Sequence, residues 1–169
     1  MVRRGDIALA DVGEEGNAAE FAIVDAARVS GGRPGQSGHV MALSISWSQL
    51  SDPEKNDAWW TLVLYHEYVH FIQYRDGHQP AGTFMMNSLD LSSPDQVEKQ
   101  CTQKRHAEEA AYHQECELAV KLGSEAEMSG LCRGVNDLTR FRKDLGLNLV
   151  RADGRGICRS AYEKQFATL

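Results

Sequence analysis

The chain has 169 residues and a formal net charge of −6 at pH 7. This length suits one domain with a real hydrophobic core and is too short for two, so we expect a single domain over residues 1–169. The acidic balance argues against nucleic-acid binding, because phosphate recognition needs clustered Lys and Arg. No apolar run reaches the roughly 18 residues of a membrane span. No apolar segment follows Arg3 and Arg4, so no signal peptide is expected.

Residues 1–50 form the part of the chain that favours β-structure. Three strands are predicted there, separated by connections rich in glycine: residues 7–10, 21–29 and 39–47. The third alternates apolar and small polar residues, which predicts one buried face made of Met41, Leu43, Ile45 and Trp47.

Residues 51–169 favour helices. The first helix is predicted to begin at the capping sequence Ser51-Asp52-Pro53-Glu54 and to end at Gly77. Four helices are predicted in all, the second of them ended by Gly123 and the third by Gly146: residues 52–75, 95–122, 135–145 and 157–166. The expected fold class is therefore α+β and mainly helical, with a small N-terminal β-sheet packed on the first helix and a second long helix beside it.

Four cysteines are present, at Cys101, Cys116, Cys132 and Cys158, with no Cys-x-x-Cys pair that would indicate a zinc knuckle. If Cys101 and Cys116 share one helix, they lie about 22 Å apart along its axis and cannot bond to each other. Each would then pair with Cys132 or Cys158, and the sequence does not choose between these pairings. Four buried thiols are an equally good interpretation, so the redox compartment stays open.

The predicted helix over 52–75 contains the pattern His-Glu-x-x-His at His66, Glu67 and His70. Residues four apart lie on one face of a helix, about 6 Å apart along the axis, so both imidazoles can reach one metal ion. Glu67 is the only charged residue over 61–74, and burying such polar groups without partners costs several kcal/mol. Two nitrogen ligands, a carboxylate base and an open coordination position are what a zinc hydrolase needs. The alternative is two core histidines that hydrogen-bond to the backbone.

The residues around this pattern resemble the extended signature of the zincin metallopeptidases, which has Val or Thr three positions before the first His. Val63 stands at that position, and its neighbours are uncharged. The continuation found in metzincins is absent, because Gln73 and Asp76 occupy the places that need Gly and His. The chain resembles instead the gluzincins, whose third zinc ligand is a Glu on a later helix. The fold that this resemblance implies is zincin-like.

The predicted helix over 95–122 carries two acidic residues, Glu108 and Glu115, on an otherwise apolar stripe. A buried carboxylate needs a partner, and a divalent cation is a good one. Residues 108–111 resemble the Glu-x-x-Ala sequence of gluzincins, in which the first Glu binds zinc. The resemblance therefore implies zinc held by His66, His70 and Glu108.

Several alternatives to Glu108 stay open as the third ligand: Glu115, Glu109, His106 and His113. Without a metal, Glu108 would pair with Lys104 on a solvated face. Gluzincins often have an Asp four residues after the ligand Glu, where it supports a ligand histidine. Tyr112 stands there in this chain, so the sequence leaves that supporting role unassigned.

The activity that the resemblance implies is that of a zinc-dependent endopeptidase. Glu67 would act as general base toward a zinc-activated water and then protonate the leaving amine. A further donor would stabilise the oxyanion, with Tyr112 and His113 as first candidates and His106 and Tyr162 as others. Gln73 is expected either to support the site by hydrogen bonding or to be a plain glutamine on the helix surface. By the same resemblance, the strand over 42–47 is expected to form the sheet edge along which a peptide substrate pairs. An interior strand is the alternative.

A catalytic domain this short resembles bacterial toxin and effector domains. That analogy implies a secreted or delivered protein rather than a cytoplasmic one, acting on a protein or peptide substrate. It also implies a larger delivery protein or an inhibitor (immunity) protein as a partner. Two other functions remain in competition: a zincin-fold domain that binds zinc without catalysis, and a metal-free helical interaction domain whose aromatic residues are core.

Overall fold

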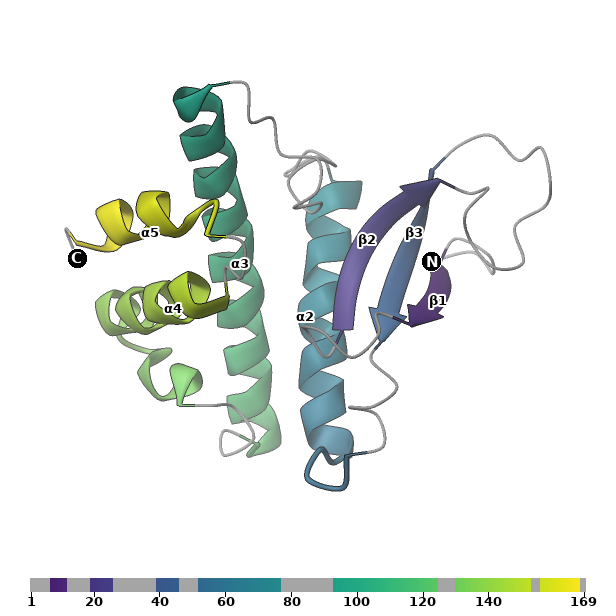
Figure 1. Cartoon of the computed structure of the whole chain (residues 1–169). Helices are drawn as coiled ribbons and strands as arrows, with labels where there is room; N and C mark the ends of the chain where they lie inside the picture. The colour runs from purple at the N-terminus through teal and green to yellow at the C-terminus, as the bar shows by residue number, and fades with distance from the viewer. Residues whose placement is uncertain are drawn as a thin grey trace.

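The structure is a computed structural model of the chain, and it describes residues 7–11, 19–25, 39–45, 52–76, 93–124, 130–152 and 156–167. Its elements are, in chain order, β1 (Ile7–Asp11), β2 (Ala19–Asp25), β3 (His39–Ile45), α2 (Asp57–Arg75), α3 (Pro94–Leu122), the 3₁₀ helix η5 (Leu131–Gly134), α4 (Leu138–Ala152) and α5 (Arg159–Phe166). The long helix α3 lies in the middle, with α2 and the strands on one side and α4 and α5 on the other (Figure 1).

The fold is mainly helical, and the α+β class predicted from the sequence is wrong. The structure describes four α-helices, of 19, 29, 15 and 8 residues, and only three short strands, of 5, 7 and 7 residues. The buried residues that the structure describes belong to the helical part of the chain, with the exception of Ala19. Helices therefore form the described core. Over the described ranges, no helix combines the length and the apolar character that crossing a membrane requires.

The three strands pair in the order β1-β3-β2, with β1 parallel and β2 antiparallel to β3. The prediction that residues 42–47 form a sheet edge is therefore wrong for residues 42–45, because β3 is the central strand. Its backbone is paired on both sides and cannot accept a substrate strand. The side chains of Met41, Leu43 and Ile45, and the whole of Trp47, lie outside the described residues, so the predicted buried face is untested.

Helix α2 begins five residues later than predicted. Asn56 is the N-cap, and its side-chain oxygen accepts a hydrogen bond from the Trp59 backbone N–H at 2.9 Å. Asp52 instead closes a turn, accepting from the backbone N–H groups of Glu54 and Lys55. The C-cap is Asp76. Gly77, which the sequence predicted in the left-handed cap position, lies outside the described residues.

Helix α3 is capped at both ends. The Ser93 hydroxyl oxygen accepts from the Gln96 N–H at 3.2 Å, with Pro94 in the first turn, so Ser93 rather than Asp95 begins the helix. The predicted end at Gly123 is confirmed. Gly123 has φ of 65°, a left-handed conformation that favours glycine.

A hydrophobic core lies between α3 and the C-terminal elements η5, α4 and α5, and two disulfides cross it. Cys101 bonds to Cys158 and Cys116 bonds to Cys132, which is one of the two pairings that the sequence left open. The bonded residues are 57 and 16 positions apart. Loops of these lengths correspond to about 4 and about 3 kcal/mol of stabilisation in the chain-entropy account.

Gly146 does not end the third predicted helix, because α4 continues through it to Ala152. Gly146 is buried, and a Cβ atom placed there would overlap the ring of Phe166 on α5. The glycine therefore permits the close approach of two helices rather than a break in one of them. From the sequence, these two uses of glycine are indistinguishable.

Candidate metal centre

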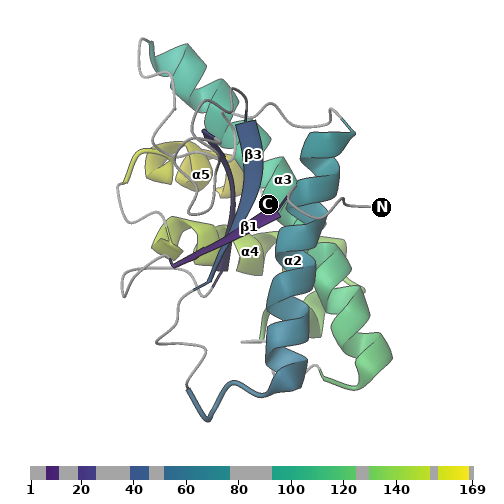
Figure 2. The ribbon, with the colours of Figure 1, turned by 90° about the vertical axis from the view of Figure 1, so that its right-hand side faces the viewer.

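The site lies where the middle of α2 meets the middle of α3. His66 contacts Glu115, which lies later on α3, while His70 contacts Glu108, which lies earlier, so the two helices run antiparallel. Figure 2 shows α3 passing behind α2 and crossing it at an acute angle. Ala111 is fully buried at this crossing, as small residues must be where helix backbones come close.

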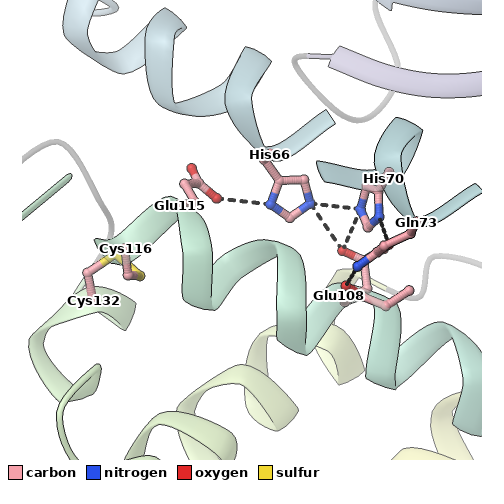
Figure 3. Close-up of polar contacts among 8 residues, drawn as sticks. His66, His70, Gln73, Glu108, Glu115, Cys116 and Cys132 are labelled. Carbon is pink, nitrogen blue, oxygen red and sulfur yellow. Dashed lines mark hydrogen bonds and ion pairs between the residues drawn. A yellow bond between two sulfur atoms is a disulfide. The ribbon is translucent and has the colours of Figure 1, made fainter. Parts of the chain in front are cut away.

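Three side-chain atoms converge between the helices (Figure 3). The Nε2 atoms of His66 and His70 are 3.0 Å apart. The Oε2 atom of Glu108 lies 3.3 Å from the first and 3.5 Å from the second. The histidines are 7% and 5% exposed. The structure thus brings together the three residues that the sequence singled out as metal ligands.

The second nitrogen of each ring has a different partner. His66 Nδ1 lies 2.9 Å from Glu115 Oε2, and an ionised carboxylate can only accept, so this nitrogen carries the proton. His70 Nδ1 lies 3.0 Å from Gln73 Oε1. The orientation of that amide follows from its other end, where Gln73 Nε2 donates to the Ala107 carbonyl at 3.0 Å. Both Nδ1 atoms are therefore assigned as donors from their partners.

It follows that in the neutral rings both Nε2 atoms carry lone pairs. Together with Glu108 Oε2 they are three acceptors, 3.0–3.5 Å from one another, and a positive charge is needed between them. Tetrahedral zinc with bonds of roughly 2.0–2.2 Å places its ligand atoms about 3.3–3.6 Å apart. Two imidazole nitrogens and one carboxylate oxygen, each histidine oriented by a partner on its other nitrogen, are also the donors that zinc takes in hydrolases. The residues present fit this metal.

The charges around the histidines also favour a cation at this site. Burial lowers the pKa of His66, but hydrogen bonds to Glu108 and Glu115 outweigh it and raise the pKa to about 10. Burial by itself raises the pKa of the Glu108 carboxyl, but the two histidines hold it well below its usual range. The cluster therefore attracts positive charge, which a proton or a divalent cation can supply.

Glu67 lies on the flank of α2 next to this cluster. It follows His66 directly, so it projects from the edge of the face that carries the histidines, and it is partly exposed. Its negative charge is among the causes that raise the pKa of His66, after burial and the contacts with Glu108 and Glu115. Glu67 is thus close enough to act on the site and is more open to solvent than the two histidines.

Tyr112 packs on the ring of His66. Its ring centroid is 4.2 Å from that of His66. Burial, followed by the charges of Glu108 and Glu115, raises the pKa of Tyr112. The phenol therefore stays protonated at neutral pH and remains a hydrogen-bond donor.

Sequence reasoning missed the role of Glu115. It considered this residue only as a substitute ligand, whereas the structure places its carboxylate on Nδ1 of His66. A signal was present, since Glu115 lies seven residues after Glu108 and thus on the same face of α3. The predicted support by Gln73 is confirmed, on His70.

Two further candidates lie away from the histidine pair. The His113 ring packs edge-on against Phe141 of α4 at 5.5 Å, and its Nδ1 lies 3.7 Å from Glu117. Tyr162 is buried in the core between α3 and the C-terminal elements. Both residues thus pack in the region of the C-terminal elements.

The remaining candidates belong to a separate cluster of charges. Glu109 pairs with Arg105 at 3.2 Å and with Arg142 at 2.6 Å. His106 is exposed, and its Nε2 accepts from Arg105 at 3.0 Å. Glu108 faces the two histidines, so it does not lie on a solvated face as the interpretation without a metal required.

A surface hollow also lies on the flank of α2 away from Glu67, and it extends over α3. It is lined by Tyr65, Tyr68, Val69, Ile72, Gln73, Asp76, His106, Ala110 and Gln114. None of the three converging residues lines it, but Gln73, which contacts His70, does.

Comparisons of the chain with protein-family models, with curated proteins and with solved structures give no match. The function of the site must therefore be argued from its own residues and geometry.

Proposed function

We propose that the chain is a zinc-dependent metallopeptidase of the gluzincin type, with its metal held by His66, His70 and Glu108. One observation carries this proposal: three acceptor atoms meet at 3.0–3.5 Å, and both histidines already use their other nitrogen as a donor. When bound there, a zinc ion lowers the pKa of a coordinated water toward about 7 and polarises the substrate carbonyl.

Glu67 is the general base in this proposal. Its carboxylate takes the proton of the attacking water and passes it to the nitrogen of the leaving amine. Two observations support this role: Glu67 is partly exposed, and its charge acts on His66. A partly exposed carboxylate beside the two histidines can contact both the attacking water and the peptide substrate.

Tyr112 is the proposed donor to the oxyanion that forms on the substrate carbonyl. It packs on His66 and keeps its phenolic proton at neutral pH. A neutral hydroxyl donor can stabilise developing negative charge without carrying a charge of its own.

The two disulfides favour a protein that works in an oxidising environment. We therefore include in the proposal a secreted or delivered chain that cleaves proteins or peptides. By analogy with toxin and effector domains, the proposal includes a delivery protein or an inhibitor as a partner.

Metal removal tests the proposal. We expect the purified chain to hold about one equivalent of zinc and to cleave an unfolded protein substrate, to lose cleavage with a chelator, and to regain it with zinc. Retained zinc without cleavage would favour a zinc-binding domain that lacks catalysis. Protein purified without chelator that contains no zinc would favour a metal-free interaction domain.

The supporting role of Glu115 gives a separate prediction. Glu115→Ala is expected to weaken zinc binding by about 10–100-fold, because His66 loses the partner that orients its ring. Glu115→Gln, which keeps an acceptor oxygen, should lose less. Zinc affinity is measured by competition with a chromophoric chelator, with the exposed Glu117→Ala on the same helix as control. An unchanged affinity of Glu115→Ala would contradict the assigned role.

A further inference from the structure

Helix α3 packs against α2 on one side and against the C-terminal elements η5, α4 and α5 on the other. One side carries Glu108 and Glu115 against α2. The other contributes to the C-terminal core, and its fully buried members there are both disulfide cysteines, Cys101 and Cys116. Over the residues that the structure describes, two covalent bonds therefore add to the side-chain contacts between α3 and the C-terminal elements, among them Glu109 with Arg142 and His113 with Phe141.

Cys116 lies close in sequence to two residues of α3 that contact His66, Glu115 and Tyr112. It directly follows Glu115, whose carboxylate binds His66 Nδ1 (Figure 3). It also lies one turn after Tyr112, which packs against the C-terminal core and against the His66 ring. The bond from Cys116 to Cys132 thus holds the segment of α3 that orients one metal ligand.

After Cys116, the last turns of α3 bury little apolar surface. Ala119 is buried, but Val120 and Leu122 are 46% and 52% exposed. The end of a helix that buries little apolar surface frays readily, since helices in proteins are held mainly by packing of one face. The tether to η5 therefore lies between residues 112–115, which contact His66, and the weakly packed end of α3.

We propose that oxidation completes the metal site: the Cys116–Cys132 bond fixes Glu115 and Tyr112 around His66, and a chain in which both cysteines are thiols binds zinc weakly. This inference rests on the proposed function, because it takes zinc as the metal. A disulfide oxidant such as oxidised glutathione forms the bond by exchange. Its own S–S bond breaks, it takes up two electrons, and its two sulfurs receive the two cysteine protons. The chain would then hold little metal where thiols are kept reduced and gain it in an oxidising compartment.

The test compares two pairs of substitutions in the full chain. Cys116→Ala with Cys132→Ala removes the bond beside Glu115, and Cys101→Ala with Cys158→Ala is the matched control. The first pair is expected to raise the zinc dissociation constant by about 10–100-fold, as loss of an orienting partner does. The control is expected to lower the melting temperature more, because its bond closes the longer loop, and to change zinc affinity by no more than about 3-fold.

Equal losses of affinity in the two pairs would overturn the inference, because they would reflect general stability. No loss in the first pair would overturn it as well. Circular dichroism checks that both pairs stay helical. If the first pair does not, Cys116→Val with Cys132→Ala, which refills the space of the sulfur, takes its place.

A measurement on metal-free protein separates this inference from the proposed function. Nitrogen NMR signals of the His66 ring report its hydrogen bond to Glu115 without any zinc. We expect them to change in the first pair and not in the control. If the unaltered chain binds no zinc, the proposed function fails, while this measurement still decides the coupling: unchanged signals in the first pair refute it.

Discussion

Glu108→Gln is expected to reduce zinc affinity by at least about 100-fold, more than substitution of an orienting residue does. The amide loses the negative charge that balances a divalent cation. It also offers an N–H donor to the two histidine Nε2 atoms, which lie 3.3 and 3.5 Å from the present Glu108 oxygen. The substitution therefore satisfies the cluster without a metal, and we expect the protein to stay folded.

Zinc content after dialysis and affinity by chelator competition measure this effect. Glu117→Gln is the matched control, because it makes the same change on an exposed part of the same helix. A Glu108→Gln protein that keeps full zinc, beside a Glu115→Gln protein that loses it, would exchange the roles of the two carboxylates.

Glu67→Gln is expected to lower kcat by about 10²–10⁴-fold and to leave zinc content unchanged. The amide can hydrogen-bond to a water but cannot accept its proton, and Glu67 is not one of the three converging residues. The decisive observation is therefore the separation of the two readouts: activity falls and metal stays.

Cleavage rates and zinc content are measured on the same preparations, again with Glu117→Gln as control. Full cleavage by a zinc-loaded Glu67→Gln protein would remove Glu67 as the base. Loss of zinc together with activity would mean that Glu67 holds the site together rather than moving a proton.

The sequence by itself determined the features that depend on neighbours within one or two turns. The positions of α2 and α3 follow from local patterns, and Gly123 ends α3 as predicted. His66 and His70 face one way because four residues make about one turn. Gln73 reaches His70 for the same reason.

Local patterns alone did not predict how these elements meet. Glycine marks a helix end at Gly123 but a contact between helices at Gly146, and only the position of Phe166 distinguishes the two. The apolar alternation over 39–47 indicated a strand, but the pairing of β3 on both sides depends on chain far from it in sequence. The fold class was wrong because the helices are long and the strands are short.

The candidate site shows most clearly the difference between what local sequence patterns predict and what tertiary contacts decide. Two acidic residues on one stripe of α3 were visible in the sequence, but their separate tasks depend on the register of α3 against α2. That register sets Glu108 on the Nε2 atoms and Glu115 on Nδ1 of His66, across 49 positions of chain. Only tertiary structure decides such a distance, because it is fixed by the packing of two helix faces.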